Sequence, residues 1–489
     1  MSNYPTTNAA AARALGNALR RLGYSADALD ELFEHDESNE REDATVADRR
    51  LPRSRLGNAF RALYFQLPSR RDDVLRALGR EGVDAAEAIG LADAGERFVA
   101  RARIMPVDSL LIASDDFPGG DGDNPSDYVA AYTPTSRICD SLTPRRRIER
   151  ALDVGTGSGV LALLSARHAK HVVATDINER ALRYGRLNAA LNGLTNVEFR
   201  EGSLFEPVDG EAFDLITCNA PYVVSPENRW AYRDSGFEGD ELSERLVREA
   251  ADHLADDGFA TLMVSWVATD EDEPDDRPLS WAETIDCDSW ILPVWGSDVL
   301  SHAATWNEPL EDQPREFGNV IDEWTRYLER LGVRWVSEGA IVLHGARDME
   351  RTVRVDSLDE DTLEDAAEQV ERAFGSRNKL AKLRSGELLQ QRLSIAMPLL
   401  LEHELEPRRK RTEVVSTTLQ VAGGTGSVID GPARALELVA MLDGNAPLED
   451  VVKRAAERLR LSEGEIGRLR REVASAAREL LELGALRFT

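Results

Sequence analysis

The chain contains little cysteine and no long apolar stretch. Cys139, Cys218 and Cys287 are its only cysteines, and widely spaced thiols of odd number fit neither a disulfide framework nor a zinc-binding knuckle. No run approaches the roughly 18 apolar residues of a membrane-spanning helix. The first residues also lack the basic and then apolar order of a signal peptide. We therefore expect a cytoplasmic protein without a membrane segment and without a metal site.

Positive charge is scarce as well. The sequence has 59 Lys and Arg against 88 Asp and Glu, a net charge of −29. Broad, sequence-independent binding to nucleic acid depends on many contacts between cationic side chains and phosphates, and this composition argues against it. Two short basic runs, Arg145–Arg147 and Arg408–Arg411, leave a local phosphate contact open, although such runs are more often simply solvated.

The chain has 489 residues, which is more than a single hydrophobic core usually organises, so several domains are expected. Residues 1–105 show apolar residues at helical spacing and predict a helical or winged-helix-like module that recognises the substrate. Residues 106–356 contain alternating strands and helices. Residues 357–489 predict a mostly helical, winged-helix-like module, and the breaker-rich loop Pro118–Pro125 lies within the middle part.

The middle part predicts an α/β fold. Helices are expected at 161–168, 179–192 and 241–254, between short apolar strands. Strands spaced by helices of this length form a parallel, doubly wound, Rossmann-like sheet. The strands are expected at 151–154, 172–175, 197–200, 215–218 and 260–265, with later ones at 333–343 and 352–355.

A glycine-rich turn follows the first of these strands. Gly155, Gly157 and Gly159 are spaced G-x-G-x-G, and glycine is needed where a ligand lies against the backbone. Dinucleotide folds use G-x-G-x-x-G to grip a pyrophosphate. Here Asp153 precedes the glycines, and its carboxylate would repel pyrophosphate but suits the ammonium group of S-adenosylmethionine (SAM). An NAD-type site or a relic of one is the alternative.

An acid after the next strand supports this interpretation. Asp176 ends Val172-Val-Ala-Thr-Asp176, and a carboxylate at that strand end can accept hydrogen bonds from both hydroxyls of a ribose. We expect SAM to be the cofactor. The expected contacts are Asp153, Gly155, Thr156, Gly157, Gly159, Asp176, Ile177, Ser203, Leu204 and Asn219.

A second motif, Asn219-Ala-Pro-Tyr222, follows a later strand. The nitrogen of an amide or a base amine is a poor nucleophile because its lone pair is delocalised. The Asn219 side-chain oxygen and a backbone carbonyl at Ala220 or Pro221 could accept its hydrogens and orient that lone pair. Pro221 would fix the loop and Tyr222 would offer an aromatic face. We expect Asn219, Pro221 and Tyr222 to be catalytic; an ordinary strand-end turn is the alternative.

Together these segments resemble a known family. Asp153–Val160, Thr175–Asn178 and Asn219–Pro226 are similar to the HemK-type class I N-methyltransferases, and most similar to the branch that methylates a release-factor glutamine. The likeness covers about residues 130–266. It implies SAM as methyl donor, Asp176 on the ribose, and Asn219 with Tyr222 around the accepting nitrogen. It also implies a macromolecular substrate, with a release-factor-like protein favoured over RNA or DNA; the oligomeric state stays open.

The sequence departs from the family at two positions. The family usually has Asn-Pro-Pro-Tyr, whereas Ala220 stands second here. The family also favours Asp after the third strand to accept the adenine amine, whereas this chain has Ser203, and a neutral hydroxyl is a weaker acceptor. Glu201 is the alternative acceptor. Two other functions remain. The same Asn-x-Pro-aromatic loop serves the methylation of a base amine in RNA or DNA, at adenine N6 or guanine N2. The two departures suggest a SAM-fold binding protein without turnover.

Several other residues invite a functional interpretation. All eight tryptophans fall between Trp230 and Trp335, where they would fill a core or line a substrate cleft. His168 and His171 lack the further ligands of a metal site, and we interpret them as structural. Cys218 adjoins Asn219, but direct methyl transfer needs no nucleophilic thiol, so we expect it to pack in a strand.

Overall fold

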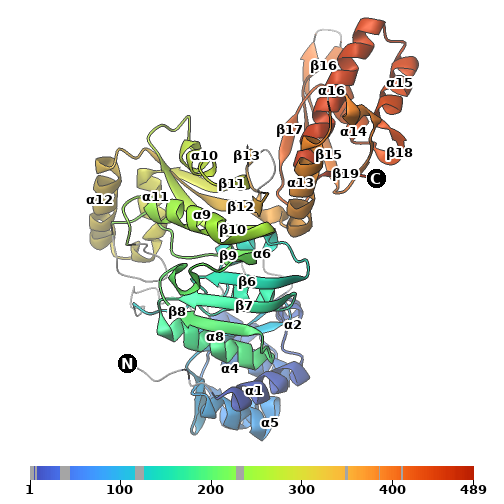
Figure 1. Ribbon diagram of the computed structural model, residues 1–489. Helices are drawn as coiled ribbons and strands as arrows, with labels where there is room; N and C mark the ends of the chain where they lie inside the picture. The colour runs from blue at the N-terminus through green and yellow to red at the C-terminus, as the bar shows by residue number, and fades with distance from the viewer. Residues whose placement is uncertain are drawn as a thin grey trace.

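The structure is a computed structural model in which three parts follow one another along the chain (Figure 1). It describes residue 5 and residues 8–33, 44–115, 126–226, 236–346, 351–384, 386–408 and 411–489. The predicted loop Pro118–Pro125 lies outside these ranges, as does Trp230. Among the described residues, no helix combines the length and the apolar character needed to cross a membrane.

Eight strands form the central sheet. Their order is β13-β11-β12-β10-β9-β6-β7-β8. β6 pairs in parallel with β7 and β9, whereas β12 runs antiparallel to β10 and β11. The strand order thus reverses between β6 and β9, and open α/β sheets bind ligands at such a switch point. The strands span Ile148–Val154 (β6), Ala169–Asp176 (β7), Val197–Glu201 (β8), Phe213–Cys218 (β9), Leu254–Ala268 (β10), Cys287–Asp298 (β11), Trp335–Gly345 (β12) and Val353–Val355 (β13).

Helices cover both faces of this sheet. Ala151 and Leu215 pack on one face with α6 (Pro134–Leu142) and α7 (Val160–Ser165). Their neighbours Leu152 and Ile216 point to the other face and pack with α9 (Glu241–His253) and α10 (Asp276–Ala282). Successive strand residues point to opposite faces, so both faces are buried. The predicted doubly wound, mainly parallel, Rossmann-like sheet is confirmed.

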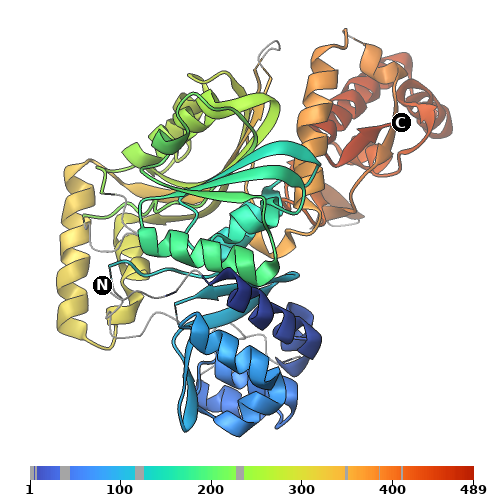
Figure 2. The ribbon, with the colours of Figure 1, turned by 60° about the horizontal axis from the view of Figure 1, so that its bottom comes forward.

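The sequence did not predict the segment between β11 and β12. It contains α11 (Val299–Trp306) and α12 (Pro314–Arg330). Both views place α12 on the side of the central part away from the C-terminal residues (Figures 1 and 2). β11 itself was also missed, because Asp288, Ser289 and Pro293 interrupt the apolar run that marks the parallel strands.

The N-terminal part combines helices with a small antiparallel sheet. Three of its strands pair in the order β1-β3-β2, β4 pairs with β5, and α5 has a kink at Gly79, where φ is 74°. Helix α1 packs on α8 (Glu179–Asn192) of the central part, and Arg20 donates hydrogen bonds to Leu191 and Asn192. The winged-helix interpretation of this module stays a prediction. The elements are α1 (Ala9–Leu22), α2 (Ala26–Phe33), α3 (Ala44–Arg50), α4 (Arg55–Leu63), β1 (Ser69–Arg70), α5 (Arg71–Ala88), β2 (Ala92–Ala94), β3 (Arg97–Ala100), β4 (Arg103–Val107) and β5 (Leu110–Ser114).

The C-terminal part contains more strand than the sequence suggested. The long hairpin β15–β16 was missed, because β15 contains Glu402, Glu404 and Glu406, and glutamate is uncommon in strands. The winged-helix interpretation here also stays a prediction. The elements are α13 (Ala366–Ala381), β14 (Arg392–Ile395), β15 (Leu399–Arg408), β16 (Arg411–Val421), β17 (Val428–Asp430), α14 (Ala433–Val439), β18 (Asp443–Pro447), α15 (Leu448–Leu459), α16 (Glu463–Glu482) and β19 (Leu486–Phe488).

Candidate functional site

The glycine turn lies at the carboxyl end of β6. Gly155, Gly157 and Gly159 have φ values of 66°, 54° and 87°, a region that side chains with a Cβ rarely adopt. The N–H of Thr156 donates to the carbonyl of Thr175 on β7 at 2.9 Å, and Gly159 is the N-cap of α7. The turn therefore connects the two strand ends and exposes backbone rather than side chain.

Asp153 lies beneath this turn instead of on its surface. Its side chain accepts hydrogen bonds from the hydroxyls of Thr156 at 2.6 Å and Thr217 at 2.8 Å, and from the N–H of Ala162 at 3.1 Å. The residue is 1% exposed, and burial raises the pKa of its carboxyl to about 6. Asp153 thus organises the turn, and its direct contact with an ammonium group stays a prediction.

Asp176 joins the turn to the end of β7. Its Oδ2 accepts the N–H of Gly157 at 2.8 Å and its Oδ1 accepts the N–H of Asn178 at 2.8 Å. Burial raises the pKa of this carboxyl, and the hydrogen bonds from the backbone act in the opposite direction. The next residue, Ile177, is 62% exposed, so an apolar side chain stands open beside the carboxylate.

The segment after β8 completes this edge of the sheet. The N–H of Gly202 donates to the carbonyl of Asp176 at 3.0 Å, and the hydroxyl of Thr175 donates to the carbonyl of Leu204 at 3.1 Å. Leu204 has a φ of 47°. Ser203 is half-buried between them and Glu201 is exposed. The structure therefore brings Ser203 and Leu204 next to Asp176.

The Asn219–Tyr222 loop leaves the adjacent strand, β9. A Cβ placed on Gly155 would lie 3.1 Å from the Cβ of Ala220 and 3.3 Å from its Cα. The two predicted motifs are therefore in contact at the switch point between β6 and β9. Tyr222 is 6% exposed, and burial strongly raises the pKa of its hydroxyl, so the phenol stays protonated at neutral pH.

Two hydroxyl residues that the sequence did not single out hold the Asn219 side chain. Its Nδ2 donates to the hydroxyl of Thr135 at 3.2 Å and to that of Ser136 at 3.0 Å. Within the described part of the chain, its Oδ1 accepts no hydrogen bond. The only sequence signal for this contact is Thr133-Pro134, an N-cap followed by proline, which marks the start of α6.

The region with these motifs was compared with known proteins. Residues 135–269 match the methyltransferase small domain. This stretch, hereafter the methyltransferase domain, coincides with the predicted likeness to HemK-type enzymes. The family match and the relatives described next support the predicted donor, SAM.

Three relatives illustrate the likeness. The ribosomal protein uL3 glutamine methyltransferase of Bradyrhizobium diazoefficiens is 34% identical over 31% of this chain and 52% of its own length. The release factor glutamine methyltransferase of Xylella fastidiosa is 38% identical over 24% and 47%. The uL3 glutamine methyltransferase of Bordetella pertussis is 33% identical over 34% and 61%. The chain spans about half to three fifths of these relatives, and the predicted HemK-type resemblance is confirmed.

The insertion α11–α12 packs on the chain that continues from the Asn219–Tyr222 loop, hereafter called the acceptor loop after its predicted role. Val223 contacts Ala303 and Trp324, and an Nε2 of His302 lies 3.0 Å from the carbonyl of Val224. The loop is thereby fixed from the side opposite the glycine turn. Trp324 is fully buried, as are Trp266, Trp281 and Trp290, which favours the core interpretation for these four.

A buried carboxyl lies under the same loop. Glu338 on β12 accepts the indole N–H of Trp306 at 2.7 Å, and the Nδ1 of His302 is 3.8 Å from its Oε1. Burial raises the pKa of Glu338 to about 7. Tyr222 is close enough for the two groups to influence each other.

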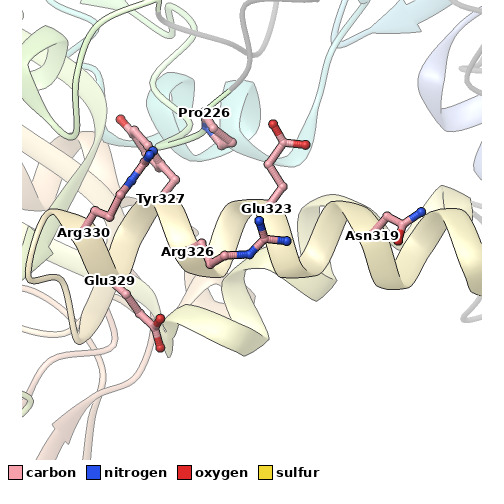
Figure 3. A pocket seen from close by; sticks show the side chains of 7 residues that line it. All are labelled: Pro226, Asn319, Glu323, Arg326, Tyr327, Glu329 and Arg330. Carbon is pink, nitrogen blue, oxygen red and sulfur yellow. The ribbon is translucent and has the colours of Figure 1, made fainter.

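A groove of about 730 Å³ runs along α12 beside the end of the loop. Figure 3 shows Glu323 and Tyr327 on the side of the helix that faces Pro226. None of its lining residues belongs to the predicted cofactor set. Side chains of both charges line the groove, since Arg326 and Arg330 lie beside acidic residues. The groove therefore favours neither anionic nor cationic ligands.

The other candidates are engaged within the methyltransferase domain. Arg145 pairs with Asp140 at 2.6 Å and Arg146 with Asp257 at 2.8 Å, which favours the structural interpretation of that basic run. Burial raises the pKa of Cys218 to about 12, so its thiol stays protonated. In the described ranges, no group of three or more His, Cys, Asp or Glu could hold a metal ion.

Proposed function

We propose that this protein is a SAM-dependent N-methyltransferase that acts on the side-chain amide of a protein glutamine. One observation carries the proposal: Asn219 stands beside the glycine turn with its nitrogen held and its oxygen available. A carbonyl oxygen there can accept a hydrogen from an amide nitrogen, as the relatives named glutamine methyltransferases would require. The predicted cytoplasmic location and macromolecular partner belong to the same proposal.

The turn fits an adenosyl group bound against backbone. Gly155, Gly157 and Gly159 present no Cβ, the Asp176 carboxylate beside them would accept hydrogen bonds from ribose hydroxyls, and Ile177 offers an exposed apolar surface. When bound there, SAM supplies a methyl group on a positively charged sulfur. The residues of the chain hold the donor in place and contribute no covalent intermediate.

The acceptor loop orients the nucleophile. The Asn219 oxygen and the Ala220 or Pro221 carbonyl accept the two hydrogens of the amide, so that its lone pair points away from them. Pro221 restricts the loop, and Val223 and Val224 are packed beneath α11 and α12. Orientation of this kind supplies about 7–11 kcal/mol in ideal cases. The proton released from nitrogen passes to water.

Asn219→Ala tests the proposal. Purified protein, tritiated SAM and a lysate from a strain lacking the protein are incubated, and the product is divided into nuclease-resistant and protease-resistant fractions. We expect label in the nuclease-resistant protein fraction, at a rate that falls at least a hundredfold in the variant, while the dissociation constant of SAM stays within about threefold.

Other outcomes assign other functions. Label in the nucleic acid fraction would indicate a base methyltransferase, and salt-sensitive binding to RNA or DNA would accompany it. SAM binding without label in any fraction would leave a binding protein. Wild-type turnover by Asn219→Ala would remove Asn219 from the mechanism.

The flanking modules complete the proposal. Residues 1–105 and 357–489 select the macromolecule, and residues 106–356 carry the chemistry. The packing of α1 on α8 supports this division, because it connects the first module to the cofactor half of the domain.

A further inference from the structure

We propose that Thr135 and Ser136 are positioning residues that set which end of the Asn219 amide faces the acceptor. This inference deepens the proposed function and rests on it. Both residues stand in the first turn of α6, 84 and 83 positions before Asn219 in the sequence.

An asparagine side chain can turn by half a rotation and exchange its oxygen and nitrogen at little steric cost. In the acceptor loop, the two orientations have opposite effects. With oxygen toward the acceptor, Asn219 accepts an N–H from the glutamine amide. With nitrogen toward it, two NH₂ groups face each other and neither finds an acceptor. A residue that fixes the orientation therefore acts on the rate of methyl transfer.

The hydroxyls of Thr135 and Ser136 provide this preference. Nδ2 carries two hydrogens, and each hydroxyl lies within hydrogen-bond distance, at 3.2 and 3.0 Å. The Oγ1 of Thr133 accepts the N–H of Ser136 and has one lone pair left for a hydroxyl hydrogen, from Thr135 at 3.0 Å or from Ser136 at 2.9 Å. A hydroxyl that donates its hydrogen there keeps its own lone pairs for the amide nitrogen of Asn219.

The first turn of α6 is stabilised by its N-cap and by packing against the sheet. Thr133 is the N-cap and accepts the N–H of Ser136 at 3.1 Å. Further along the helix, the Cys139 thiol donates to the carbonyl of Thr261 on β10 at 3.6 Å, and Ser136 itself is 6% exposed. The hydroxyls are therefore held by packing against the sheet.

Thr135 also reaches the second predicted substrate residue. Its hydroxyl is close enough to that of Tyr222 to lower the pKa of the phenol, against the larger effect of burial. One threonine thus lies beside both side chains that are expected to surround the acceptor nitrogen, although both of these residues are far from Thr135 in the sequence.

The test compares the double variant Thr135→Val/Ser136→Ala with Thr135→Ser, which keeps the hydroxyl. We expect the initial rate of methyl incorporation at saturating SAM to fall at least tenfold in the double variant and to stay within about threefold in Thr135→Ser. The dissociation constant of SAM should change less than threefold in both. Ser141→Ala, at the other end of α6, is the matched control and keeps the wild-type rate.

A second measurement does not depend on activity. In protein labelled with ¹⁵N asparagine, the side-chain NH₂ signal of Asn219 is identified by its loss in Asn219→Ala. We expect its hydrogens to exchange with solvent at least tenfold faster in the double variant. Unfolding midpoints in urea establish that both variants fold.

Each outcome decides the question. A wild-type rate in the folded double variant, unchanged exchange, or a large loss of SAM binding would overturn the inference. If the wild-type protein labels nucleic acid instead of protein, the proposed function fails. If it labels protein and the double variant is equally fast, only the inference fails.

Discussion

Gly155 and Ala220 touch across the switch point of the sheet. The Cβ that Gly155 lacks would lie 3.1 Å from the Cβ of Ala220, and Gly155 has a φ of 66°. The cofactor turn and the acceptor loop therefore share a contact between two small residues. Neither segment can move at this point without displacing the other.

Gly155→Ala should impair the site beyond its effect on stability. The new Cβ adds backbone strain of about 1–2 kcal/mol and presses on Ala220, so we expect SAM binding at least tenfold weaker by calorimetry. Gly193→Ala is the control, because Gly193 also has positive φ, at 69°, but has nothing within 4 Å of the added Cβ. Equal SAM binding by wild type and Gly155→Ala would contradict the prediction.

Gly185→Ala should destabilise the protein although alanine favours helices. Its Cβ would lie 2.4 Å from Cε1 of Phe199, and overpacking of this kind costs about 1–3 kcal/mol. Gly318→Ala in α12 meets no atom within 4 Å, and should stabilise by about 0.5–1 kcal/mol. Urea unfolding of both variants measures the difference; a gain in stability for Gly185→Ala would show that Phe199 adapts freely.

Ser203→Asp should strengthen SAM binding. A carboxylate accepts a hydrogen bond from an amine more strongly than a hydroxyl does, and a gain of about 1 kcal/mol corresponds to roughly fivefold in affinity. Ser203→Ala is the paired control and should weaken binding or leave it unchanged. Weaker binding by Ser203→Asp would place the adenine amine elsewhere, with Glu201 as the next candidate.

Glu338→Gln should flatten the dependence of stability on pH. Burial raises the pKa of Glu338 to about 7 from a model-compound value of 4.5. The folded state therefore keeps a proton that the unfolded state loses, and wild-type stability falls as pH rises from about 4.5 to 7. A shift of this size corresponds to as much as about 3 kcal/mol, and Gln, which stays neutral and still accepts the Trp306 N–H, removes this loss.

The measurement is urea unfolding of both proteins at pH 5 and pH 8. We expect the variant to gain stability relative to wild type at pH 8 and to gain less at pH 5. Glu360→Gln is the matched control, because Glu360 also accepts an indole N–H, from Trp295 at 2.9 Å. The same flattening in that variant would show that the effect does not come from Glu338.

The grouping of the glycine turn with Asp176 could be predicted because its signals are local. The glycines of the turn follow a buried strand directly, and Asp176 ends the next one, so strand periodicity placed them at one edge of the sheet. The structural role of Asp153 was harder to predict from the sequence. Its three hydrogen bonds come from Thr156, Ala162 and Thr217, and the last of these lies on another strand.

The acceptor half depends on contacts between distant segments. Thr135 and Ser136 contact Asn219 only because α6 packs against β10, and no local sequence pattern predicts that packing. The insertion α11–α12 was missed for the same reason. The positions of its helices depend on buried contacts, such as that of Trp324 with Val223. These contacts form only in the folded chain.

The insertion between β11 and β12 also affects the order in which the site can form during synthesis. His302 contacts the carbonyl of Val224, 78 residues earlier, and β12 pairs with β10 from Trp335 to His344. A nascent chain that has emerged only as far as β10 already contains the glycine turn, Asp176 and Asn219. The segment that supports the acceptor loop, α11 and α12, has not yet emerged at that stage. The residues proposed to hold the methyl donor therefore emerge before the segment that supports the loop proposed to orient the acceptor.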